Sequence, residues 1–174
     1  VAEEEFSEDM QKMGGTEALE EPYLDVPIFK LYKKRIIWLF ILFVGETLTI
    51  AAMANFQETL EQVLVLSTFI PLIISSGGNS GSQAATLIIQ ALALGEITVQ
   101  DWWRIARREI LSGLFMGVTL GIVGFFIIYG GHQFFGLFGE HFIRIGFAIG
   151  TAIIGVVMWG TIMGSMLPLL LKKL

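Results

Sequence analysis

The sequence predicts an all-α membrane protein, a polytopic helical bundle, from three observations. Of its 174 residues, 54% are hydrophobic, and the mean hydropathy is +0.71. The apolar residues are gathered into four long runs with polar or glycine-rich connections between them. A helix needs about 20 apolar residues to cross a bilayer. We therefore expect four membrane helices, over residues 36–54, 63–94, 110–129 and 142–171.

The first 35 residues differ in composition from the remainder. Residues 1–30 hold nine acids against two lysines, a charge run that usually forms a solvated segment. The same carboxylates are ligands that hard divalent cations prefer. We interpret residues 1–35 as an acidic cytoplasmic linker without a cleavable signal peptide, and 36–174 as the membrane domain. The chain has no cysteine, which excludes disulfides and thiolate metal sites.

The second apolar run, residues 63–94, contains the polar and glycine-rich patch Ser75–Gln83. As one straight helix its 32 residues would extend about 48 Å, beyond a hydrocarbon core of roughly 30 Å. Irregular backbone at membrane depth is tolerated only where protein covers it or water reaches it. We expect this helix to be strongly tilted or broken at the patch.

Four polar side chains follow in helical register. Asn79, Gln83, Thr86 and Gln90 are spaced by 4, 3 and 4 residues, which places them on one face of a helix. Two interpretations stay open. The side chains hydrogen-bond neighbouring helices and hold the bundle together, or they form the wall of a water-filled path.

The connection at residues 95–109 combines Trp102 and Trp103 with three arginines. Aromatic and basic residues are typical of the membrane interface, so we expect a short segment lying at the membrane surface. With the N-terminus in the cytoplasm, ten Lys and Arg residues fall on the cytoplasmic side and only Arg144 falls outside. This asymmetry predicts a cytoplasmic N-terminus.

Glycines recur at helix-packing intervals in the last two runs. The third run carries Gly113, Gly117, Gly121 and Gly124, and the fourth carries the pairs Gly146/Gly150 and Gly160/Gly164. Small residues at such spacing allow two membrane helices to approach closely. We assign these glycines to packing.

Glu46 is the acid that hydropathy places inside the first membrane helix. An intramembrane carboxylate is costly and is often functional, for example as a metal ligand. The alternative is a hydrogen-bonded or protonated side chain that ties helices together. Both interpretations stay open.

The patch and its flanks resemble a known family. Gly77–Ala84, with Ala93–Ile97 downstream, is similar to the MgtE family of magnesium channels, as are Glu20–Tyr23 and Lys33–Arg35 upstream. The resemblance covers nearly the whole chain. It implies a homodimer in the inner membrane with five membrane helices per subunit and a pore between the second and fifth helices. It further implies cytosolic domains that close the gate when intracellular Mg²⁺ is high.

The resemblance also suggests site residues. Together with the polar stripe, it predicts an ion path bordered by Gly77, Gly78, Asn79, Ser82, Gln83, Thr86 and Gln90. It implies regulatory cation sites at Glu17, Glu20, Glu21 and Asp25. The family's fifth helix, with its ion-selecting aspartate, would follow Leu174, and the sensor domains would precede Val1. We therefore expect the chain to be part of a longer protein.

The chemistry of the stripe agrees with a hard, hydrated cation. It holds no Lys, Arg, Cys, His or Met, which argues against an anion path and against copper or zinc. The predicted function is a Mg²⁺ channel whose partners are a second copy, membrane lipid and Mg²⁺, with no nucleic acid. A proton- or sodium-coupled transporter of divalent cations is the alternative.

An intramembrane serine protease is a more remote alternative. Gly78–Gly81 matches the four-residue GxSG pattern, with Ser80 as nucleophile. Both histidines, His132 and His141, fall in the connection between the third and fourth runs rather than on a membrane helix. A nucleophile and its base must lie within about 3.2 Å, so this arrangement disfavours an enzyme.

Overall fold

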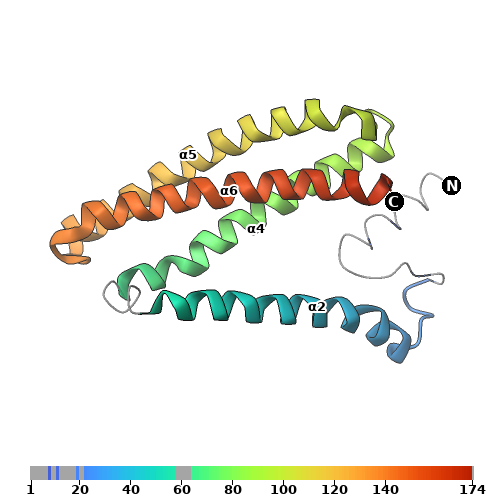
Figure 1. Ribbon diagram of the computed structural model, residues 1–174, viewed down its shortest axis with the longest axis horizontal. Coiled ribbons are helices and arrows are strands. Elements are labelled where there is room, and N and C mark those ends of the chain that lie inside the picture. Colours follow the sequence, from blue (N-terminus) through green and yellow to red (C-terminus); the bar gives the residue numbers. More distant parts are fainter. Residues whose placement is uncertain (1–7, 9–10, 12–18, 20–21, 58–63, 174) are drawn as a thin grey trace. The chain divides into compact units, whose positions relative to one another are not determined.

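The computed structural model describes residues 8, 11, 19, 22–57 and 64–173. Their long elements are four helices: α2 (Ile28–Asn55), α4 (Leu64–Ala93), α5 (Trp102–Phe135) and α6 (Phe142–Lys173) (Figure 1). Two short 3₁₀ turns, η1 (Val99–Asp101) and η2 (Gly139–His141), precede α5 and α6. Each long helix is sufficiently long and apolar to cross a membrane. The prediction of an all-α membrane protein is confirmed.

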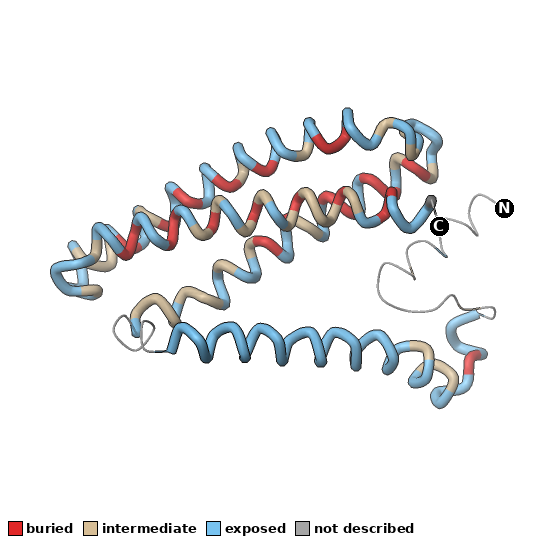
Figure 2. Tube along the Cα trace, viewed as in Figure 1, coloured by how far each residue is buried: buried red, intermediate tan, exposed pale blue. Residues whose placement is uncertain are grey.

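The chain divides into two compact units, residues 1–62 and 63–174. In the first unit, α2 begins at Ile28, earlier than the predicted start at residue 36, directly after Pro27. Proline is tolerated there because the first helical N–H groups need no partner inside the helix. None of the residues of α2 is buried (Figure 2). Its segment after Arg35 is almost entirely apolar, which suits a lipid environment.

In the second unit, α6 packs against both α4 and α5. One cluster of buried side chains joins α5 to α6 through Ile128, Ile149 and Val157. A second cluster joins the last turns of α4, the first turns of α5 and the end of α6 (Figure 2). Its members are Ile88, Leu92, Ile105 and Leu169. The C-terminal ends of α4 and α6 therefore lie together with the N-terminal end of α5.

Glycines bring these helices into backbone contact, as predicted. All four predicted glycines of α5 are buried. A Cβ atom on Gly121 would lie 2.8 Å from the carbonyl oxygen of Gly150 in α6. On the other side of α6, a Cβ on Gly81 of α4 would lie 2.9 Å from the carbonyl oxygen of Gly160. A Cβ on Gly164 would clash with the Gly81 carbonyl.

The predicted break in the second membrane helix is wrong. Leu64–Ala93 is one helix of 30 residues that runs without interruption through Ser75–Gln83. A glycine inside a helix costs only about 1 kcal/mol relative to alanine, whereas an unsatisfied backbone group in hydrocarbon costs several. The backbone therefore stays helical through the patch. The Ser76 hydroxyl donates a further hydrogen bond to the Leu72 carbonyl, at 2.7 Å. The glycines of the patch serve close packing instead.

The predicted surface segment 95–109 is divided by the start of α5 at Trp102. Ile105 and Ala106, which lie between the exposed Arg104 and Arg107, are buried. Their burial anchors this first part of α5, so the arginine-rich stretch is helical. Asp101 closes the preceding turn, accepting hydrogen bonds at its Oδ2 from the backbone N–H and the hydroxyl of Thr98, at 2.9 and 2.8 Å. The second half of the segment is therefore the beginning of a membrane helix.

Replacing Gly164 with alanine should destabilise the bundle. Its new Cβ would overlap the Gly81 backbone carbonyl, which cannot move aside as a flexible side chain can. We expect Gly164→Ala to cost about 1–3 kcal/mol, measured by thermal unfolding of the purified protein in detergent. Gly155→Ala is the matched control on the same helix, because nothing lies within 4 Å of the added atom. Equal effects of the two substitutions would contradict the close contact.

Candidate functional site

Helix α4 has two chemically different faces. The face toward α6 is lined by small and aliphatic residues, and the face away from it is polar. The buried residues are Gly77, Ser80, Ala84, Ala85, Ile88, Ile89 and Leu92. The polar residues Asn79, Ser82, Gln83, Thr86 and Gln90 are all exposed in the chain.

Four of the polar residues line one hollow. Asn79, Ser82, Gln83 and Thr86, with Leu87, surround a volume of about 560 Å³ on the exposed face of α4. The Thr86 hydroxyl donates to the Ser82 carbonyl at 2.9 Å. Within the described part of the chain, the Gln83 amide makes no hydrogen bond, so its polar atoms are available to water. The hollow offers neutral oxygen and nitrogen atoms and no charged group.

The hollow therefore contains only four of the seven residues that were predicted to border an ion path. Gly77 is buried, and a Cβ there would meet the Val156 side chain and backbone of α6. Gly78 is exposed with nothing within 4 Å of an added Cβ. Gln90 is exposed but does not line the hollow. That the remaining four border an ion path stays a prediction.

Sequence reasoning missed a buried polar contact behind the stripe. The hydroxyls of Ser80 and Thr161 lie 2.5 Å apart, and both residues are buried. Thr161 donates its proton to the Val157 carbonyl at 2.8 Å, so Ser80 donates to Thr161. The sequence could have indicated this contact. At helical spacing, Ser80 shares a face with the small residues Gly77, Gly81 and Ala84, and such a face packs closely against another helix. The serine that the protease alternative requires is thus bonded to a threonine.

The predicted cation sites in the first unit are not assembled among the described residues. Glu17, Glu20 and Glu21 lie outside those residues. Asp25 and Glu46 are exposed. In the part of the chain that the structure describes, no group of three or more His, Asp or Glu residues could hold a metal ion. The roles of these carboxylates stay predictions.

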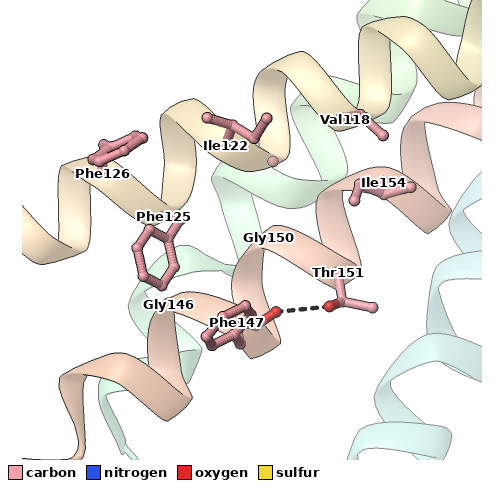
Figure 3. Close-up of a pocket in the computed structure, with 10 residues that line it drawn as sticks. Val118, Ile122, Phe125, Phe126, Gly146, Phe147, Gly150, Thr151 and Ile154 are labelled. Atoms are coloured by element: carbon pink, nitrogen blue, oxygen red, sulfur yellow. Dashed lines mark hydrogen bonds between the residues drawn. The ribbon is translucent and has the colours of Figure 1, made fainter.

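A hollow between α5 and α6 contrasts with that on α4 (Figure 3). It has a volume of about 250 Å³, with Phe125 and Phe147 at its wall and Gly150 at its floor. Its side-chain hydroxyl, that of Thr151, already donates to the Phe147 carbonyl at 2.8 Å (Figure 3). An apolar surface of this kind suits hydrocarbon and cannot orient a hydrated ion.

Four helices that are long and apolar enough to cross a membrane, one of them with a polar face, define an integral membrane protein of the helical type. The family model of MgtE, described as a divalent cation transporter, matches residues 70–174. The chain belongs to the MgtE family.

Curated relatives agree over the length of the chain. The magnesium transporter MgtE of Thermus thermophilus is 32% identical over 174 residues, 100% of this chain and 37% of the relative. The magnesium transporter MgtE of Enterococcus faecalis is 28% identical, over 100% of this chain and 36% of the relative. The magnesium transporter MgtE of Bacillus subtilis is 25% identical, over 98% of this chain and 36% of the relative. The chain thus spans little more than a third of the length of these relatives.

Removing the buried hydroxyl of Thr161 should destabilise the contact between α4 and α6. Thr161→Val keeps the side-chain shape but leaves Ser80 without its partner, and hydrogen bonds between membrane helices contribute about 0.6–1.7 kcal/mol. The measurement is the midpoint of thermal unfolding in detergent. Thr151→Val is the matched control, because this exposed hydroxyl bonds only to its own helix. If both variants lose the same stability, the contact between helices contributes nothing.

Proposed function

We propose that this chain forms part of a magnesium channel in which hydrated Mg²⁺ moves along the exposed polar face of α4. The observation that carries the proposal is the hollow lined by Asn79, Ser82, Gln83 and Thr86 on a long helix that contains no charged residue. Membership of a divalent cation transporter family and the names of the relatives support the choice of ion.

The lining suits an ion that keeps its water. Mg²⁺ dehydrates reluctantly and commonly retains several water ligands. Neutral amides and hydroxyls orient such water without holding the ion too tightly to leave. The lining of the hollow contains no carboxylate that would trap a dication and no cationic side chain that would repel it.

The path needs a second wall, and we propose that a second copy of the protein supplies part of it. One face of α4 is occupied by α6 through Gly77 and Gly81. The polar face opposite is exposed along its length, and such a face is costly in lipid. A homodimer that sets two polar faces around one axis would remove this cost.

The charges support an inner-membrane protein with a cytoplasmic N-terminus. Because the ends of α4 and α6 meet the start of α5, the exposed Arg104, Arg107 and Arg108 lie at the same end as Lys172. Arg144 lies in the first turn of α6, at the opposite end of that helix. Basic residues gather on the cytoplasmic side of membrane proteins. We further propose that Glu17, Glu20, Glu21 and Asp25 take part in closing the gate when intracellular Mg²⁺ is high.

A divalent cation transporter coupled to protons or sodium is the second candidate, favoured by Glu46 on α2. Coupling to protons requires a group that titrates, and the lining of the α4 hollow contains none. Glu46 lies well inside α2, and such a mechanism would use an acid in that position. The channel is preferred because its path needs only the four neutral residues.

Replacing Gln83 with leucine in the full-length protein should reduce Mg²⁺ uptake into dye-loaded liposomes about tenfold, because an apolar side chain cannot orient the water around the ion. Thr86→Val should reduce uptake less, since its hydroxyl is partly engaged by Ser82. The matched control is Thr119→Val, an exposed threonine of α5 with the same type of bond to its own helix. Uptake that is unchanged in Gln83→Leu would assign the stripe to helix packing.

Collapse of the proton gradient and removal of sodium should leave the rate of Mg²⁺ uptake unchanged. A channel is driven by the electrochemical gradient of its own ion alone, so the membrane potential is held constant between conditions. The measurement is the initial rate of uptake with a protonophore and in sodium-free buffer. A rate that falls in either condition and is restored with the gradient would favour the coupled transporter, and Glu46→Gln would then test the carrier of the proton.

A further inference from the structure

A second polar hollow lies where α4 ends and α5 begins. Its volume is about 440 Å³. Aliphatic side chains of α4, including Leu87 and Ala91, form one wall, and Ile97 and Ile105 continue the apolar surface. Charged side chains from the connection and from the first turns of α5 complete the lining. The hollow therefore combines an apolar wall with a charged rim.

The rim carries three carboxylates and two guanidiniums. Asp101 is engaged, since its Oδ2 accepts two hydrogen bonds from Thr98. The other charged groups are two guanidiniums and two carboxylates: Arg104, Arg108, Glu96 and Glu109. Among the described residues, these four form no hydrogen bond with other side chains. Arg108 and Glu109 attract each other electrostatically, as do Arg104 and Asp101. A ligand that carries one positive and one negative group complements this rim.

The position of the hollow favours a lipid over a soluble ligand. It is formed where two membrane helices end and begin, beside Trp102 and Trp103, which are 54% and 57% exposed. The two indole rings lie 5.5 Å apart. Exposed tryptophans prefer the level of the lipid head groups. The apolar wall of α4 then extends from the rim toward the hydrocarbon.

We propose that this hollow binds a phospholipid whose head group carries a phosphate and a primary ammonium, as in phosphatidylethanolamine. Arg104 and Arg108 are four residues apart, so they project from one face of α5 and can donate together to the phosphate. Glu96 and Glu109 accept hydrogen bonds from the ammonium. One acyl chain lies along Leu87 and Ala91.

The same chemistry disfavours other ligands. A divalent cation would face two guanidinium groups, and a lipid with a purely anionic head would face three carboxylates. Phosphatidylcholine keeps both charges, but its ammonium is methylated and has no N–H to donate. Phosphatidylethanolamine should therefore bind more tightly than phosphatidylcholine, because only its ammonium can donate hydrogen bonds.

The test uses the full-length protein, freed of lipid and incubated with equimolar phosphatidylethanolamine, phosphatidylglycerol and phosphatidylcholine of identical acyl chains. Bound lipids are counted by native mass spectrometry. We expect phosphatidylethanolamine to be retained about tenfold more than either competitor, as for the loss of one charge-assisted hydrogen-bonded group. Equal retention of the three lipids, or retention of none, overturns the proposal.

Variants locate the lipid. Arg104→Gln combined with Arg108→Gln should abolish the preference, whereas Arg107→Gln, an exposed arginine of the same helix outside the hollow, should preserve it. Glu109→Gln keeps the shape of the side chain and should lower retention of phosphatidylethanolamine without lowering that of phosphatidylglycerol. If Arg107→Gln removes the preference as fully as the double variant, the lipid binds to general surface charge and the proposal fails.

Discussion

The arrangement of the second unit depends on backbone contact between α6 and its two neighbours. Gly160 and Gly164 meet Gly77 and Gly81 of α4, and Gly150 meets Gly121 of α5. In a membrane there is little hydrophobic force between helices, so association relies on close packing and hydrogen bonds. Such a contact fixes the orientation of each helix about its own axis. If a helix turned so that a larger side chain replaced a glycine at the contact, that side chain would clash with the neighbouring backbone. The buried bond between Ser80 and Thr161 adds a polar contact at the same surface.

This constraint fixes where the polar residues of α4 can lie. With Gly77, Ser80 and Ala84 held against α6, the side chains of Asn79 and Gln83 must point away from it. The stripe is then unavailable to bond α5 or α6, which are the helices packed in its own unit. Bonding to a neighbouring helix would therefore need a helix from outside this unit, and contact with water stays a prediction. The buried glycines and the exposed amides of the patch thus lie on separate faces of the helix.

Much of this arrangement could be predicted from the sequence, and the failures have physical causes. Hydropathy predicted the four helices, and residue spacing predicted both the stripe and the glycine contacts of α5. The break in α4 was predicted because a straight helix of this length exceeds the hydrocarbon core, and it is wrong because the glycine-rich patch packs within one continuous helix. Its packing partners, Gly160 and Gly164, were noted in the sequence but could not be matched to it. The start of α5 was placed too late because three exposed arginines conceal the buried pair Ile105 and Ala106. Sequence spacing finds the faces of a helix, but only the fold shows what each face contacts.

The central claim is that the polar face of α4 borders water in the assembled membrane protein. The most direct test is reaction with a membrane-impermeant thiol reagent after Asn79→Cys or Gln83→Cys in a cysteine-free full-length protein, since this chain has no cysteine of its own. Thr119→Cys, on an exposed face of α5, is the matched control. We predict rapid modification at positions 79 and 83, slowed by Mg²⁺ and accompanied by loss of Mg²⁺ uptake, with little reaction at position 119. Failure of positions 79 and 83 to react faster than position 119 would contradict the account.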